Sequence, residues 1–143
     1  MTHRIAIQGL AAAFLAIFAN GCGDASEKTS ATEPPEPESL ETIGRRAFAA
    51  CAICHSVRPA SEGLQAGKIG PTLSGIVGRY SASIDAFAYS RAFQKTSFIW
   101  DEARLDAFIA SPGAVVRGNR MSYPGEPDPE KRAAIIAYLK TLQ

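Results

Sequence analysis

The chain has 143 residues, enough for one domain of ordinary size. Its net charge of +1 combines an acidic leader with a basic remainder. Residues 24–41 hold six acidic residues and one lysine, whereas residues 42–143 hold thirteen Lys and Arg and eight Asp and Glu. The basic residues are scattered and no nucleic-acid motif accompanies them, so we expect acidic protein partners and no nucleic acid.

Residues 1–21 have the pattern of an export signal. The start MTHR is positively charged, and the apolar run IAIQGLAAAFLAIFA is shorter than the ~20 apolar residues that a membrane-spanning helix needs. The segment ANGCGD that follows resembles the end of a bacterial lipoprotein signal, in which Cys22 receives the lipid. Ordinary cleavage nearby is the alternative, and it would leave Cys22 as a free or disulfide-linked thiol.

Residues 22–42 are predicted to be a tether. The stretch GDASEKTSATEPPEPESLE is dominated by Pro, Glu, Ser and Thr, and Leu40 is its one large apolar residue. Such a segment cannot bury enough apolar surface to offset the entropy of ordering, so we expect a disordered, partly extended tether. The folded domain is then expected over residues 43–143.

The periodicity of that domain predicts helices separated by long loops. TIGRRAFAACAIC has the apolar spacing of an amphipathic helix, and WDEARLDAFIASP predicts a helix that Pro112 closes. Residues 59–79 and 113–128 are rich in Gly and Pro and are expected to be loops, with a short turn within 72–78. The last helix should follow the N-cap Asp128, with Pro129 at its first position. Its buried stripe is predicted to contain Ile135, Ile136, Leu139 and Leu142.

No alternating pattern is long enough to build a sheet, so the predicted fold is all-α. Loops of this length are unusual in a compact domain unless something other than the chain fills its centre.

The pentapeptide CAICH, from Cys51 to His55, indicates what fills it. A zinc site would need a second ligand pair, and a thioredoxin-like dithiol would need a βαβ frame, which the pattern lacks. C-x-x-C-H is the attachment signature of c-type haem. On one helical turn Cys51 and Cys54 share a face and can form two thioethers, while His55 reaches the iron. We therefore predict one covalently bound haem c.

Met121 is the best candidate for the second axial ligand. No other histidine follows the attachment site, and Lys68 and Lys95 are weaker candidates. Met121 lies in the polar loop RGNRMSYPG, where a role in core packing is hard to explain. His/Met ligation raises the reduction potential and is typical of electron-transfer cytochromes. It also leaves no open iron position for substrate, so we expect no enzymatic activity.

Several further motifs resemble those of the class I cytochromes c, in the branch of mitochondrial cytochrome c and bacterial cytochrome c2. These are GRRAFAACAICHSV, GPTLSGIVGR, FAYSRAF, FIW and IIAYLK, and the resemblance covers about residues 43–143. It implies a fold of three main helices and long loops around the haem, in which Gly44 and Phe48 cross the last helix near Ile135 and Tyr138.

The resemblance also implies roles for individual residues around the haem. The Pro71 carbonyl accepts the N–H of His55, Leu73 packs on the haem face, and Tyr89, Trp100 and Arg79 surround a haem propionate. In the methionine loop Gly118 and Asn119 fit the family pattern, whereas Arg117 replaces a proline. Phe108 stands where many members have a tyrosine whose hydroxyl reaches the methionine sulfur.

Together these features predict a monomeric one-electron carrier, lipid-anchored on the periplasmic side of a bacterial membrane. It would move electrons from a quinol–cytochrome c oxidoreductase, respiratory or photosynthetic, to a terminal oxidase. The cations expected near the haem edge, for docking, are Arg58, Lys68, Arg117 and Arg120. Two alternatives remain open: a dedicated haem c subunit of a periplasmic dehydrogenase, and a haem sensor or peroxidase, which needs an open iron.

Overall fold

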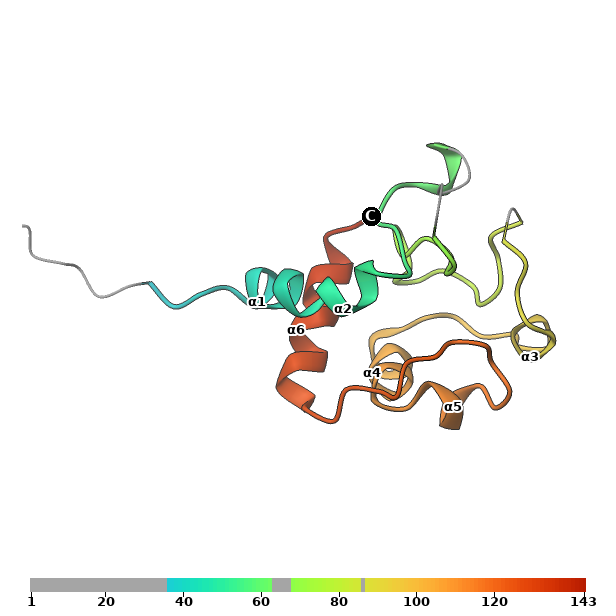
Figure 1. Ribbon diagram of the computed structural model, residues 1–143. Coiled ribbons are helices and arrows are strands. Elements are labelled where there is room, and N and C mark those ends of the chain that lie inside the picture. The colour runs from blue at the N-terminus through green and yellow to red at the C-terminus, as the bar shows by residue number, and fades with distance from the viewer. Residues whose placement is uncertain (1–35, 63–67, 86) are drawn as a thin grey trace, which may run out of the picture. The chain divides into compact units, whose positions relative to one another are not determined.

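The computed structural model describes residues 36–62, 68–85 and 87–143, so the predicted signal, Cys22 and most of the tether lie outside the described residues. The elements in chain order are α1 Leu40–Ala47, α2 Ala49–Ala52, the 3-10 turn η1 Ala60–Glu62, α3 Arg91–Gln94, α4 Glu102–Ala110, α5 Pro112–Val115 and α6 Pro129–Lys140 (Figure 1). Over these ranges the only β pairing is an isolated bridge between Tyr80 and Ile99, which confirms the all-α prediction. No helix in the described part is long and apolar enough to cross a membrane.

Helix α6 begins where the sequence predicted. The Asp128 carboxylate accepts hydrogen bonds from the backbone N–H groups of Glu130 and Lys131, and Pro129 occupies the first turn, where its missing N–H has no consequence. The residues of α6 that are buried are Ala134, Ile135, Ile136 and Leu139. Leu142 lies just beyond the helix and is partly buried against the same core, so the predicted stripe is confirmed.

Helix α1 begins at Leu40, two residues before the predicted helix and inside the segment predicted as tether. The cause is Ser39, whose side chain accepts a hydrogen bond from the Thr42 N–H and caps the helix. The predicted single helix is also interrupted, because α1 ends at Ala47 and α2 starts at Ala49. Phe48 between them is 4% exposed and anchors this corner in the core.

Helices α1 and α6 cross at close range, as Figure 1 shows. A Cβ atom on Gly44 would overlap the backbone carbonyl of Ala134, so only glycine permits this approach. The rings of Phe48 and Tyr138 meet edge to face beside the crossing, with centroids 5.2 Å apart. The contact that the family resemblance implied for these helices is therefore present.

Helix α4 forms as predicted and presents Leu105 and Phe108 to the core. Asp101 caps its start by accepting from the Arg104 N–H at 2.7 Å. The helix ends at Ala110, and Pro112 opens the short helix α5, which the sequence analysis had placed in a loop. For α3 the sequence analysis made no prediction. Both have four residues, too few for an apolar periodicity to be visible.

The core is one cluster of side chains contributed by α1, α4, α6 and the intervening loops. Its buried members are Phe48, Ile76, Trp100, Leu105, Phe108, Val116, Ile135, Ile136 and Leu139. Trp100 lies edge to face with Phe98 and Phe108, at centroid distances of 4.8 and 4.9 Å. This aromatic group joins α4 to the loop before it.

Candidate haem site

The two cysteines and the histidine of CAICH lie on one helical turn at the end of α2. Backbone hydrogen bonds to the Cys51 carbonyl from Cys54, at 3.1 Å, and from His55, at 2.8 Å, continue the turn beyond the helix. Both thiols are free and partly buried. Burial raises the pKa of the Cys51 thiol, and the neighbouring Cys54 raises it further. The arrangement places the two thiols and the imidazole on the same turn, where the thiols can form two thioethers to one group.

The imidazole of His55 is held by the chain in one tautomer. Its Nδ1 lies 2.7 Å from the Pro71 carbonyl oxygen, which only accepts, so Nδ1 carries the proton and Nε2 keeps its lone pair. Burial lowers the pKa of His55, the hydrogen bond to Pro71 opposes this, and Lys68 adds to the lowering. A neutral ring with a free Nε2 is the form that binds a metal ion.

Three further hydrogen bonds fasten the segment around Pro71 to the segment around His55. The Gly70 N–H donates to the Cys54 carbonyl at 2.9 Å, the Leu73 N–H to the Ser56 carbonyl at 2.9 Å, and the Thr72 hydroxyl to the Arg58 carbonyl at 2.5 Å. Together with the His55–Pro71 bond, these bonds join residues 54–58 to residues 70–73. These hydrogen bonds orient the imidazole ring.

Sequence reasoning missed Gly70 and Thr72. A Cβ on Gly70 would lie 2.5 Å from Cε1 and 2.6 Å from Nδ1 of His55, so the ring rests directly on the glycine. Thr72 is only 2% exposed, and its hydroxyl both donates to Arg58 and accepts from the Ser74 N–H at 3.1 Å. The pair GP in GPTLSGIVGR was a visible signal for Gly70, whereas a single threonine gives no signal.

Met121 lies in a loop that its neighbour Asn119 organises. The Asn119 amide nitrogen donates to the carbonyls of Pro112, at 3.0 Å, and Val116, at 2.8 Å, while its amide oxygen accepts from the Met121 N–H at 2.8 Å. The Met121 side chain is partly buried against the main core. Asn119 thus fixes the backbone from which the thioether extends.

The fold brings three of the predicted haem contacts to one apolar cluster. Cys51, Leu73 and Met121 are far apart in the sequence, yet each packs against the same buried core that contains Phe108. The three residues therefore contribute to one continuous apolar core.

Arg79, Tyr89 and Trp100 were predicted to surround a propionate. Burial raises the pKa of the Tyr89 hydroxyl, whereas a hydrogen bond with the Ile84 backbone and the charge of Arg79 oppose the rise. Trp100 is 6% exposed, and within the described residues its indole N–H has no hydrogen-bond partner. A buried indole usually has one. This orphaned donor suits an acceptor such as a carboxylate.

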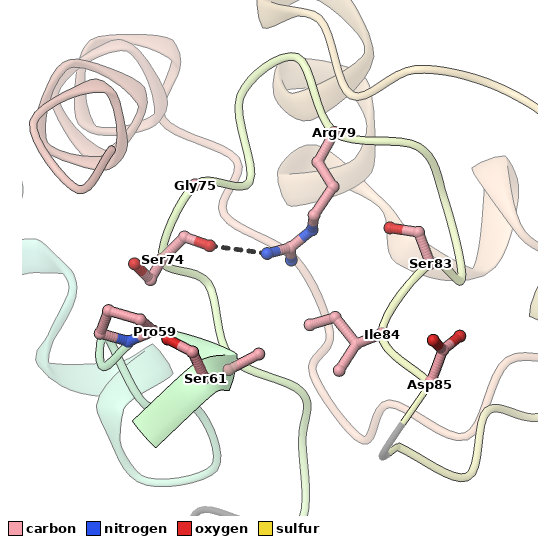
Figure 2. Close-up of a pocket in the computed structure, with 9 residues that line it drawn as sticks. Pro59, Ser61, Ser74, Gly75, Arg79, Ser83, Ile84 and Asp85 are labelled. Atoms are coloured by element: carbon pink, nitrogen blue, oxygen red, sulfur yellow. Dashed lines mark hydrogen bonds between the residues drawn. The ribbon is translucent and has the colours of Figure 1, made fainter. Parts of the chain in front are cut away.

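The guanidinium of Arg79 is tied to the neighbouring loop. It donates to the Ser74 carbonyl at 2.6 Å (Figure 2). It also donates to the Thr72 carbonyl at 2.8 Å, and burial lowers its pKa. A surface groove of about 520 Å³ adjoins it, lined by Pro59, Ala60, Ser61, Ser74, Gly75, Arg79, Ser83, Ile84 and Asp85. Arg79 therefore connects the Thr72 loop to the neighbourhood of Tyr89.

Comparison with known proteins agrees with this geometry. The family model for cytochrome c matches residues 42–143. Cytochrome c2 of Rhodopila globiformis is 42% identical over 93 residues, covering 65% of this chain and 83% of that protein. Cytochrome c2 of Blastochloris viridis is 36% identical and covers 78% and 84%. The structure of cytochrome cH from Methylobacterium extorquens superposes with a TM-score of 0.63 at 39% identity, covering 71% of this chain and 97% of that one.

The chain belongs to the cytochrome c family. It carries one covalently attached haem c, for which Cys51 and Cys54 provide the attachment motif, and it is a haem c electron carrier. The residues present fit the group. They offer two free thiols, a neutral imidazole with Nε2 available and a buried indole N–H that has no acceptor among the residues that the structure describes.

Proposed function

We propose that this protein is a one-electron carrier whose haem c is held by His55 and Met121, and that it works on the periplasmic side of a bacterial membrane. The observation that carries the proposal is the 2.7 Å hydrogen bond between His55 Nδ1 and the Pro71 carbonyl, directly beside the attachment cysteines. It presents a neutral imidazole through Nε2 and strengthens its donation to a metal.

Haem c, when bound, supplies reversible one-electron chemistry at iron. The chain's own residues orient the group and shield it. Cys51 and Cys54 would hold it through thioethers, and the His55 nitrogen and the Met121 sulfur would serve as its iron ligands. A thioether ligand favours the reduced state and raises the potential. With both of these side chains bound, the site would leave no room for a substrate at the metal.

Three donors of the chain are proposed to bind a propionate. Trp100 offers its indole N–H, Tyr89 its hydroxyl, and Arg79 supplies positive charge close to Tyr89. A buried carboxylate needs such partners, because an unpaired charge in the interior is strongly unfavourable. Leu73, Phe108 and Asn119 complete the proposed surroundings, the first two by apolar contact and Asn119 by holding the Met121 loop.

The proposed electron donor is a quinol–cytochrome c oxidoreductase and the proposed acceptor a terminal oxidase. The surplus of thirteen Lys and Arg over eight Asp and Glu in residues 42–143 suits acidic docking surfaces on both. Carriers of this kind exchange electrons with both complexes in a salt-dependent manner. A subunit dedicated to one dehydrogenase would exchange with its own enzyme alone.

The ligand assignment is tested with Met121→Ala. We expect the variant to lose the weak red sulfur-to-iron charge-transfer band of the ferric protein, to have a lower potential, and to bind carbon monoxide in the ferrous state, which the unaltered protein should not. Lys95→Ala is the matched control, because Lys95 is the alternative ligand. If Lys95→Ala loses the axial ligand and Met121→Ala keeps it, the assignment is wrong.

We further propose that Cys22 is lipidated and that the acidic segment after it tethers the domain to the membrane. The motif ANGCGD supports this proposal. Cys22→Ser should yield a haem-loaded protein that fractionates with the soluble periplasm, and mass spectrometry of the unaltered protein should find acyl chains on Cys22. A Cys22→Ser protein that stays with membranes after a high-salt wash would show that the anchor lies elsewhere.

A further inference from the structure

Arg132 occupies a position in the first turn of α6 that the helix itself does not favour. A cation there faces the positive end of the helix dipole, where negative side chains are the favourable ones. Yet the Arg132 side chain is only 13% exposed, and it donates to three oxygen atoms that lie outside α6. Local helix chemistry does not explain this residue, so the explanation has to come from its tertiary contacts.

The guanidinium of Arg132 joins α4 to the segment that precedes α6. Its Nε donates to the Asp106 carboxylate of α4 at 2.7 Å. Its Nη1 donates to the carbonyls of Glu126, at 3.0 Å, and Pro127, at 2.9 Å. The donors of a guanidinium are fixed in a planar fork, so one rigid group holds three points of the chain together.

Glu126 and Pro127 lie at the far end of the methionine loop, which runs from the end of α5 to the start of α6 and passes α4 on the way (Figure 1). The Glu126 N–H donates to the Ile109 carbonyl at 2.9 Å. Gly125, with a φ of +112°, lies so close to the end of α4 that a Cβ atom on it would overlap the Ala110 carbonyl oxygen. The far end of the loop is therefore pressed against α4, where the Arg132 fork reaches it.

The near end of the methionine loop is attached to the same region of the molecule by Asn119. Its amide nitrogen donates to the carbonyls of Pro112 and Val116, which belong to α5 and the residue after it. Met121 lies between the two attached ends, so its backbone is restrained from both sides. Asn119 acts from inside the loop, whereas Arg132 acts from a different helix.

We propose that Arg132 is a positioning residue for Met121: by holding the far end of the methionine loop against α4, it keeps the Met121 sulfur in place as a ligand. The inference rests on the proposed ligation by His55 and Met121 and deepens it. Within the described residues, none of the hydrogen bonds of Arg132 goes to a proposed haem ligand, so it acts through the backbone of the loop. Without the fork, the loop gains conformational freedom whenever the sulfur leaves, and displacement of Met121 becomes easier.

The test measures how readily imidazole, added as an external ligand, displaces Met121 in the ferric, haem-loaded protein. Loss of the red sulfur-to-iron charge-transfer band reports the displacement, and no redox partner is needed. Arg132→Gln removes both the charge and the fork, whereas Arg132→Lys keeps the charge without the fork. Asp106→Asn removes the ionic partner and leaves the carbonyls of Glu126 and Pro127 available to Arg132.

Lys140→Gln is the matched control. The Lys140 ammonium donates to the Glu102 carboxylate at 2.7 Å, so this pair also joins α6 to α4. It does so at the last residue of α6 and the first of α4, away from the segment that Arg132 holds. Melting temperatures of all variants are measured alongside, because a role confined to packing α4 on α6 would lower the melting temperature without changing the affinity for imidazole.

We expect the apparent affinity for imidazole to rise roughly tenfold in Arg132→Gln, because hydrogen bonds from a charged group are lost at one end of the loop. Arg132→Lys and Asp106→Asn should show a smaller rise, about threefold, since each removes only part of the interaction. Lys140→Gln should bind imidazole as the unaltered protein does. If Arg132→Gln fails to load haem, Asp106→Asn compared with Lys140→Gln decides by the same criterion.

Two outcomes would overturn the proposal and leave the carrier function standing. In the first, Arg132→Gln melts earlier but binds imidazole like the unaltered protein, which would mean that Arg132 only packs the helices. In the second, Lys140→Gln raises the affinity for imidazole as much as Arg132→Gln, so that the effect is general destabilisation. If the unaltered ferric protein lacks the charge-transfer band, the Met121 assignment itself is wrong, and the positioning role fails with it.

Discussion

The two segments that carry the proposed axial ligands are stabilised in different ways. On the His55 side, hydrogen bonds spread over Pro71, Gly70, Leu73 and Thr72 join two stretches of chain. On the Met121 side, a single side chain, that of Asn119, makes three bonds within its own loop.

The His55 side should therefore tolerate the loss of one hydrogen bond, whereas the Met121 side depends mainly on one residue, Asn119. Outside Asn119, the methionine loop is anchored by the Arg120 guanidinium, which donates to the Ala88 carbonyl at 2.6 Å, and by the Glu126 N–H, which donates to the Ile109 carbonyl at 2.9 Å. We therefore expect thermal or chemical stress to release Met121 before His55.

The largest effect is expected where the His55 side is vulnerable to crowding. Gly70→Ala would force the imidazole away from the Pro71 carbonyl, because the added Cβ would lie 2.5 Å from the ring. Combined overpacking and hydrogen-bond loss should lower the free energy of unfolding of the haem-loaded protein by roughly 2–4 kcal/mol. Denaturant titration followed by haem absorbance measures it.

Gly113→Ala is the control for that change. Gly113 lies in α5, has no atoms near the position a Cβ would take, and needs no left-handed backbone conformation. Its replacement should leave stability unchanged or slightly raised. If both alanine variants are equally stable, the close approach between Gly70 and His55 does not constrain the folded protein.

An intermediate effect is expected at Asn119. Asn119→Ala should release three hydrogen bonds of the methionine loop and destabilise Met121 ligation by about 2 kcal/mol. The readout is the red charge-transfer band, which should disappear at a lower denaturant concentration while the global transition shifts less. Asn119→Asp keeps the acceptor for the Met121 N–H and should recover part of the loss. Coincident loss of the band and of the global fold would contradict the separate behaviour of this loop.

The smallest effect is expected at Thr72. Thr72→Val removes the hydroxyl that donates to Arg58, but the bonds of Gly70, Leu73 and His55 remain. The free energy of unfolding should fall by about 1 kcal/mol, and haem spectrum and potential should stay close to those of the unaltered protein. Thr72→Ser should restore stability. A large change in the reduction potential of Thr72→Val would show that the remaining hydrogen bonds of the His55 side cannot hold the imidazole by themselves.

The sequence was sufficient to predict the parts of the fold that depend on local chemistry. Caps and apolar spacing located α4 and α6, and CAICH identified the cofactor, because attachment needs fixed residues at fixed spacing. The start of α1 at Leu40 was missed because Ser39 looked like one more polar residue of the acidic segment. The break at Phe48 depends on tertiary packing that no local pattern records.

The haem surroundings were predicted through family motifs more than through residue chemistry. Pro71, Arg79 and Trp100 came from the resemblance. In the structure the Pro71 carbonyl accepts from His55, Arg79 donates to the carbonyls of Ser74 and Thr72, and the Trp100 indole N–H has no partner among the described residues. The close contact between Gly70 and the His55 ring could not be predicted, although the pair GP marked the position, since the contact depends on which loops lie side by side. The roles at the haem that the resemblance implied stay predictions, namely those of Pro71, Leu73, Arg79, Tyr89, Trp100, Phe108 and Asn119.

The close crossing of α1 and α6 has a consequence for the order of assembly. The chain's first described helix is completed by its last, so this contact cannot form until the C-terminal residues have been made and delivered. Closing so long a loop is entropically unfavourable and comes late unless something holds the chain together beforehand. Attachment at Cys51 and Cys54 needs only α2 and the turn after it. Haem can thus be attached before α1 and α6 make contact, and the docking of α6 on α1 then completes the fold.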